Sequence, residues 1–124
     1  YQICTIDEYS QISSEYSKVK DEKKDKCRIV VLTISIENTT EEVADYTPSF
    51  IFVSEELNAF NGAIPIGSGS RHCTLLPHET KEMKLRAYIG ASQLDEKNLD
   101  KLDSSTITLV YSFYPYRRKL VFSR

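Results

Sequence analysis

The side chains best suited to chemistry in this chain are His72, Cys73 and His78, which lie close together in the sequence. Two imidazoles and a thiolate, with a water in the fourth position, would satisfy the tetrahedral preference of Zn²⁺. Their spacing matches no standard zinc motif, and a strand–turn–strand placement would separate the two histidines across the turn. A nucleophile–base pair built on Cys73 is also disfavoured, because adjacent strand residues point to opposite faces. We expect no metal site here, and keep a small-ligand or metal-binding role of this loop as the alternative function.

A second candidate lies in the terminal segment YSFYPYRRK, where Tyr114, Tyr116, Arg117 and Arg118 surround Pro115. Tyrosine and arginine are enriched in the hot spots of protein interfaces, and tyrosine rings also stack on sugars and peptides. A proline turn is stiff before binding, so it loses little entropy on association. The alternative is that the tyrosines cover one end of the fold while the arginines stay solvated. We predict that a partner-binding surface includes this hairpin.

The sequence offers no positive evidence for an enzyme. No glycine-rich phosphate loop follows a strand, and no G-x-S-x-G elbow is present. Paired acids such as Glu41-Glu42 and Glu55-Glu56 lie in polar turns, where solvation explains them. We therefore predict neither catalytic residues nor a cofactor.

The three cysteines, Cys4, Cys27 and Cys73, are far apart and form no CxxC pair. One disulfide with one free thiol, or three free thiols, are both compatible with this spacing. If a disulfide forms, we expect Cys27–Cys73, which would clamp a loop to the central sheet. The sequon Asn38-Thr39-Thr40 falls in a predicted hairpin loop, and we interpret it as turn chemistry before glycosylation.

Three segments with a period of two would position these groups. Apolar residues alternate with polar ones over Cys27–Asn38, Met83–Ile89 and Thr106–Tyr114, which predicts strands with one buried face. The positions expected in the core are Leu32, Ile34, Leu85, Ile107, Leu109 and Tyr111.

Weaker patterns complete the chain. Val43–Val53 is a β-rich run in which Pro48 indicates an edge or a bend, and Lys119–Phe122 predicts a closing strand. Asn61-Gly62 predicts a tight turn, and Ser92 with Asp95 has the spacing of a capping box before one short helix.

The N-terminal residues 1–26 are predicted as an edge strand, a short helix behind a Thr5/Glu8 capping box, and a charged loop. The chain begins at Tyr1 rather than Met, so we expect that a processed leader preceded it.

Length and charge limit the possible classes. The 124 residues fit one domain, 1–124, and 16 basic against 18 acidic side chains give no field that would attract nucleic acid. The longest apolar stretch is far shorter than the roughly 20 residues of a membrane-spanning helix. Roughly six or seven short strands separated by turns predict an all-β protein, an antiparallel β-sandwich of the immunoglobulin type with one or two short helices.

Three local patterns resemble the uncharacterised immunoglobulin-like domains of secreted or lipid-anchored proteins from Gram-positive bacteria. They are the strand ending in Glu37-Asn38-Thr39-Thr40, the turn Leu76-Pro77-His78-Glu79-Thr80, and the final hairpin Tyr111–Phe122. His78 stands where such domains usually have glycine. The resemblance implies an extracellular or membrane-anchored lipoprotein with a binding or scaffolding role. We expect the partner to be another protein or a cell-surface component, and the chain to be a monomer or a weak oligomer.

Overall fold

The computed structural model of the chain describes residues 1–16, 18–67, 72–113 and 116–122. Strands account for most of its regular structure. They are β1 (Gln2–Cys4), β2 (Arg28–Glu37), β3 (Ala44–Tyr46), β4 (Pro48–Ser54), β5 (Ala59–Pro65), β6 (Cys73–Leu75), β7 (Thr80–Ile89), β8 (Ile107–Phe113) and β9 (Tyr116–Phe122). The helices are short: α1 (Ile6–Tyr9), α2 (Asp21–Lys24) and the 3₁₀ helix η1 (Glu96–Ser104). No helix in the described part of the chain is long and apolar enough to cross a bilayer.

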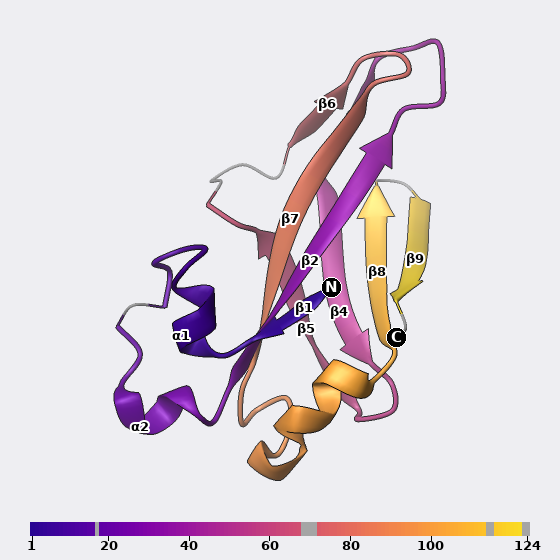
Figure 1. Ribbon diagram of the computed structural model, residues 1–124. Coiled ribbons are helices and arrows are strands. Elements are labelled where there is room, and N and C mark those ends of the chain that lie inside the picture. The colour runs from indigo at the N-terminus through magenta and orange to yellow at the C-terminus, as the bar shows by residue number, and fades with distance from the viewer. Residues whose placement is uncertain (17, 68–71, 114–115, 123–124) are drawn as a thin grey trace.

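Seven of the strands form one antiparallel sheet in the order β1-β2-β7-β5-β4-β8-β9, which curls into a half-barrel (Figure 1). β3 and β6 form a separate two-stranded ribbon. The predicted immunoglobulin-like sandwich is therefore wrong, although the mostly β, antiparallel character is confirmed. The physical reason is β5, which pairs with β4 on one side and with β7 on the other. It therefore joins into one sheet the two groups of strands that a sandwich would keep as separate sheets.

The junction between β5 and β7 is short. Their ladder consists of Ile64 opposite Arg86 and Pro65 opposite Leu85. Two further bonds support it, from the Ile66 N–H to the Lys84 carbonyl (3.0 Å) and from the Asn61 side-chain amide to the Tyr88 carbonyl (2.7 Å). Asn61-Gly62, predicted as a turn, lies inside β5, and the chain instead turns before β5 at Asn58, whose φ is +53°.

The concave face of the half-barrel holds the main core. It is formed by the inward residues of β2, β7, β4, β5 and β8, and by η1, which covers one end of the half-barrel (Figure 1). Of the predicted core positions, Leu32, Ile34, Leu85, Ile107 and Leu109 are buried, whereas Tyr111 is half-buried. The helix after Ser92 is confirmed in place, but it begins at Glu96 and Asp95 makes no side-chain cap bond.

A smaller core lies on the convex face, under the N-terminal segment. Its buried members are Cys4, Ile6, Tyr9, Cys27, Ile29 and Val31. The predicted edge strand is β1, and the Thr5/Glu8 capping box at α1 is confirmed in both directions. Residues 18–26, predicted as a loop, contain the short helix α2.

An arginine fastens the segment after α1 to the sheet. Glu15 accepts hydrogen bonds from Arg86 and from the Tyr9 hydroxyl (3.1 Å), and the Arg86 guanidinium lies 5.2 Å from the centre of the Tyr16 ring. Burial raises the pKa of Glu15, but the hydrogen bond and charge of Arg86 more than offset it, so the pKa lies below its ordinary value.

The ends of β2 and β7 that lie farthest from η1 project as an arm (Figure 1). Leu76, Pro77, His78 and Glu79 form the turn before β7, closed by the bond from the Glu79 N–H to the Leu76 carbonyl (3.0 Å). His78 has a φ of +62°, a conformation that glycine adopts at lower cost. Pro48, predicted at an edge or bend, is the first residue of the interior strand β4, where a missing N–H is tolerated.

Candidate functional site

One edge of β2 is only partly covered. β1 pairs with Ile29, Val30 and Val31, and its ladder ends there. β2 continues to Glu37, and no strand in the described part of the chain pairs with its outer edge over Leu32–Glu37. An open strand edge presents backbone donors and acceptors that another strand can use.

The hydrogen-bond pattern identifies the backbone groups on that edge. The Asn38 N–H donates to the Glu79 carbonyl (2.9 Å), so Asn38 uses its backbone groups toward the β7 side. Because such bonds alternate along an antiparallel strand, Ile36 and Ile34 also bond to β7, whereas Glu37, Ser35 and Thr33 direct theirs outward. Three N–H and three C=O groups therefore face the open edge.

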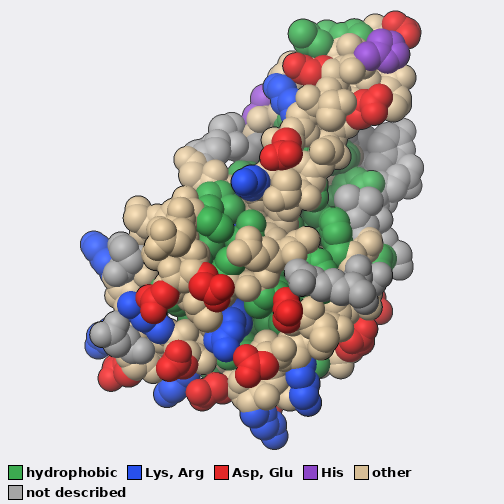
Figure 2. All heavy atoms as spheres, viewed as in Figure 1, with side chains coloured by type: hydrophobic (Ala, Val, Ile, Leu, Met, Phe, Trp, Pro, Cys, Tyr) green, Lys and Arg blue, Asp and Glu red, His purple; other side chains and the backbone are tan. Residues whose placement is uncertain are grey.

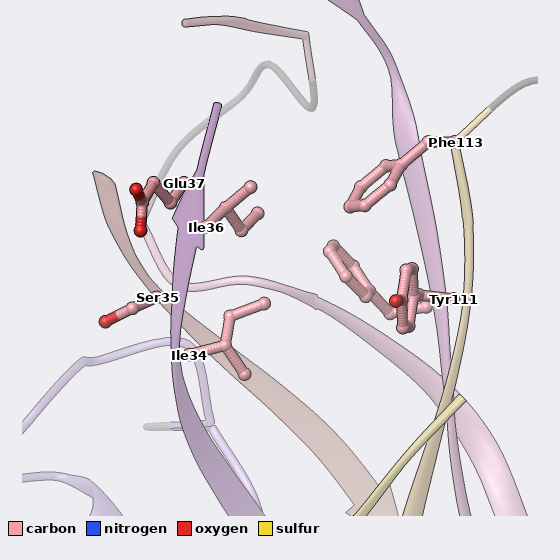
Figure 3. A pocket seen from close by; sticks show the side chains of 7 residues that line it. Ile34, Ser35, Ile36, Glu37, Tyr111 and Phe113 are labelled. Carbon is pink, nitrogen blue, oxygen red and sulfur yellow. The ribbon is translucent and has the colours of Figure 1, made fainter. Parts of the chain in front are cut away.

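An apolar cavity of about 250 Å³ lies beside this edge. Its lining residues are Ile34, Ser35, Ile36, Glu37, Phe50, Tyr111 and Phe113. In Figure 3, Ile34 and Ile36 point from β2 toward Tyr111 and Phe113 of β8, while Ser35 and Glu37 point away. Since Ser35 and Glu37 line the cavity with their side chains turned outward, they present their backbone to it. We call the cavity together with the β2 edge the groove.

Packed aromatic rings form the wall opposite β2. The Phe113 ring lies 5.0 Å from that of Tyr111, and 6.4 Å from that of Phe50 in an edge-to-face arrangement. Tyr46 of the ribbon packs against Phe113 from the other side at 4.5 Å. The Tyr46 hydroxyl oxygen is buried without a hydrogen-bond partner among the described residues. Burial raises the pKa of Tyr46, and the neighbouring Cys73 thiol raises it further. Such a wall is rigid and suited to contact with aliphatic side chains.

Hydrophobic side chains also reach the surface at the foot of the arm (Figure 2). On the convex face the exposed apolar residues include Phe60, Ile51 and Val121, which are 65%, 36% and 57% exposed. These residues lie on the outer surface of the sheet, whereas the groove combines apolar walls with an open backbone edge.

The predicted binding hairpin lies mostly outside the described side chains. Tyr114 lies outside the described residues, and so do the side chains of Tyr116, Arg117 and Arg118, whose backbone forms part of β9. The register places Tyr116 opposite Phe113 and Arg118 opposite Tyr111. The hairpin thus begins at the aromatic wall of the groove, and its role in binding stays a prediction.

The structure does not bring His72, Cys73 and His78 together as a ligand set. Cys73 is buried against Tyr46, and His72, next to it in the sequence, is exposed and paired with Asp45. His78 lies at the tip of the arm, where its Nε2 is 2.6 Å from the Glu41 carboxylate. Within the described part of the chain, no three His, Cys, Asp or Glu side chains could jointly hold a metal ion.

All three cysteines are buried free thiols, so the conditional Cys27–Cys73 bridge is not present in this structure. Cys27 belongs to the convex core, whereas Cys73 lies in the ribbon. Burial raises the pKa of the Cys4 thiol and that of Cys27. A high thiol pKa lowers the thiolate fraction, so neither cysteine is set up as a nucleophile.

The sequon asparagine is structural. Asn38 is 5% exposed, and its amide nitrogen lies 2.7 Å from the Glu42 carbonyl, 3.1 Å from that of Leu75 and 3.2 Å from that of Leu76. Its side-chain oxygen accepts from the Thr40 N–H and hydroxyl. These bonds hold the tip of the arm together, which agrees with the interpretation of the sequon as turn chemistry.

The groove itself was not foreseen. Its walls come from β2 and β8, which are remote in the sequence. One signal was present: the run from Cys27 to Asn38 is much longer than the predicted N-terminal edge strand, so that strand alone could not pair with the whole run.

Comparisons with family models and with curated proteins gave no match. Among solved structures, a crystal structure of a protein from Archaeoglobus fulgidus is similar over 86% of this chain and 89% of its own, with a TM-score of 0.43 and 10% sequence identity. At that score the similarity carries no argument about function.

Proposed function

We propose that this chain is an interaction module, rather than an enzyme, and that it binds an extended segment of another polypeptide by strand addition to β2. The observation that carries the proposal is the open edge of Thr33, Ser35 and Glu37 beside an apolar cavity. In strand addition, backbone hydrogen bonds supply affinity and pockets for alternate side chains supply specificity. The groove offers both.

The size of the cavity favours peptide side chains over a separate small molecule. At about 250 Å³ it is smaller than the roughly 300–1,000 Å³ of sites for drug-sized ligands. Alternate residues of an added strand point to one face, so two aliphatic side chains would enter beside Ile34 and Ile36. The open edge would then be satisfied by the backbone between them.

A neutral peptide tests the proposal. Acetyl-Thr-Val-Thr-Val-Thr-amide is titrated into ¹⁵N-labelled protein, and backbone amide shifts are followed by NMR. We expect saturable binding with a dissociation constant on the order of 100 μM, since a short flexible strand loses much of its gain to ordering. The largest shifts should fall on the amides of Thr33, Ser35 and Glu37.

Two matched variants separate the groove from general stickiness. Ile36→Ser should weaken binding about tenfold, the equivalent of roughly 1.4 kcal/mol of lost apolar contact. Phe60→Ser removes an exposed apolar side chain from the convex face and should leave binding unchanged. The proposal fails if the edge amides do not respond to the peptide, or if both variants weaken binding equally.

The proposed function does not depend on the extracellular location or on the membrane anchor that the resemblance implies. A partner protein that supplies the extended segment is compatible with either side of a membrane.

A further inference from the structure

We infer, on the basis of the proposed function, that the groove selects its ligand by the charges at the two ends of the bound segment. The inferred ligand is an extended peptide that runs antiparallel to β2, with a basic residue at its N-terminal end and an acidic residue at its C-terminal end. Glu37 is the specificity-determining residue.

The direction follows from β1, which already occupies the first part of the same edge. Gln2 lies opposite Val31 and Cys4 opposite Ile29, so β1 is antiparallel to β2. A strand that continues the line of β1 beyond Val31 keeps the same direction and the same ladder pattern. Its first residue lies opposite Glu37 and its fifth opposite Thr33.

The register then fixes which ligand residues point where. Residues opposite Ile36 and Ile34 share their inward face and enter the cavity, so these positions are apolar. Residues opposite Glu37, Ser35 and Thr33 point outward and exchange backbone hydrogen bonds with the edge. The five ligand positions therefore read outward, inward, outward, inward, outward.

The charges on the outward face differ between the two ends of the edge. Near one end of the edge, Glu37 lies on β2 itself and Glu82 lies on β7 opposite Ser35. Near the other end, Lys84 lies on β7 opposite Thr33. All three charged side chains belong to exposed residues. Directly opposed unlike charges stabilise a strand pair, and like charges destabilise it. A lysine at the first ligand position lies directly opposite Glu37, whereas a glutamate at the fifth position lies opposite Thr33 and faces Lys84 only across the width of β2.

Two peptides of identical composition test the charge reading. Acetyl-Lys-Val-Thr-Val-Glu-amide should bind about five- to tenfold more tightly than acetyl-Glu-Val-Thr-Val-Lys-amide at low ionic strength, because an unlike pair replaces a like pair opposite Glu37, with a smaller contribution from Lys84 across β2. The ratio should shrink toward one in about 1 M salt, where screening acts over roughly 3 Å. Calorimetric titration gives both constants.

Protein variants assign the effect to Glu37. Glu37→Lys should abolish or invert the ratio of the two affinities, while Glu55→Lys, with the same change in net charge in the turn between β4 and β5, should preserve it. If Glu55→Lys changes the ratio as much as Glu37→Lys does, the effect comes from net charge and the inference is overturned.

N-methylation of the peptide backbone tests the register. A methyl group on the central threonine nitrogen removes the N–H that faces Ser35 and should abolish binding. A methyl group on either valine nitrogen, which points away from β2, should leave binding largely intact. The reverse result would overturn the antiparallel register.

The outcomes separate this inference from the proposed function. If both charged peptides bind equally and shift the edge amides as the neutral peptide does, the charge reading is wrong and strand addition stands. If no peptide shifts these amides, both are wrong. If the edge amides shift with protein concentration alone, the occupant is a second copy of this chain and the inference is overturned.

Discussion

Replacing Asn38 with alanine should destabilise the protein by about 2–4 kcal/mol, because one buried amide supports the whole tip of the arm. Its two hydrogens are shared among the carbonyls of Glu42, Leu75 and Leu76, and its oxygen accepts two bonds from Thr40. A net hydrogen bond contributes about 0.5–1.5 kcal/mol, and a buried polar group left without its partner costs about 1–3 kcal/mol.

Urea unfolding monitored by circular dichroism measures this change as a lower midpoint with an unchanged slope. The adjacent Thr39→Ala, at an exposed position of the same sequon, serves as the control and should shift the free energy of unfolding by less than about 0.5 kcal/mol. Asn38→Asp keeps the shape of the side chain but sets a carboxylate oxygen against backbone carbonyls, so it should be at least as damaging at pH 7. If Asn38→Ala unfolds within about 0.5 kcal/mol of the parent, the amide is not the support that its contacts suggest.

Four further predictions test the packing. Leu109→Ala, at a fully buried position, should cost about 2–5 kcal/mol in urea unfolding, and a smaller loss would mean that the core collapses around the cavity. Arg86→Met should cost about 1–2 kcal/mol at pH 7. Because the pKa of Glu15 is lowered in the fold, the part of this cost that comes from the Glu15 carboxylate should be lost as pH falls through that folded pKa, while the contact with the Tyr16 ring remains. A cost that does not change with pH would contradict this expectation. Burial and, second to it, the charge of Glu15 raise the pKa of Tyr9 to about 12. Because the folded state holds this proton more tightly than the unfolded state, the free energy of unfolding should decline from pH 10 to about 12. Tyr9→Phe should flatten this decline when denaturant midpoints are measured against pH. His78→Gly should raise the thermal midpoint, since relief of the positive φ, about 1 kcal/mol, exceeds the loss of an exposed contact to Glu41; a lower midpoint would show that the contact dominates.

Strands with a clear alternation of apolar and polar residues could be predicted from the sequence. Alternation located β2, β7 and β8 to within a few residues, and side-chain capping located α1, because both signals depend on neighbours in the chain. β5 gave the wrong signal. Asn61-Gly62 reads as a turn, but in the fold Asn61 bonds to the Tyr88 carbonyl, and that contact is set by a strand remote in the sequence.

The arrangement of the sheet could not be predicted in the same way. An inward-facing residue such as Leu32 has the same alternation whether the opposite wall is a second sheet or the far side of one curled sheet. The groove was hidden for a related reason: Ile36 and Phe113 become neighbours of one cavity only after the sheet curls.

The short β5–β7 ladder divides the half-barrel into two groups of strands, which we call plates, joined by few backbone hydrogen bonds. β1, β2 and β7 form one plate, and β5, β4, β8 and β9 form the other, with Ile64 and Pro65 as the backbone seam between them. Bending along such a seam breaks few hydrogen bonds, whereas bending within either plate breaks many. The separation of the groove walls is therefore governed by side-chain packing on the concave face, and this compliance would let the groove adjust its width to ligand side chains of different size.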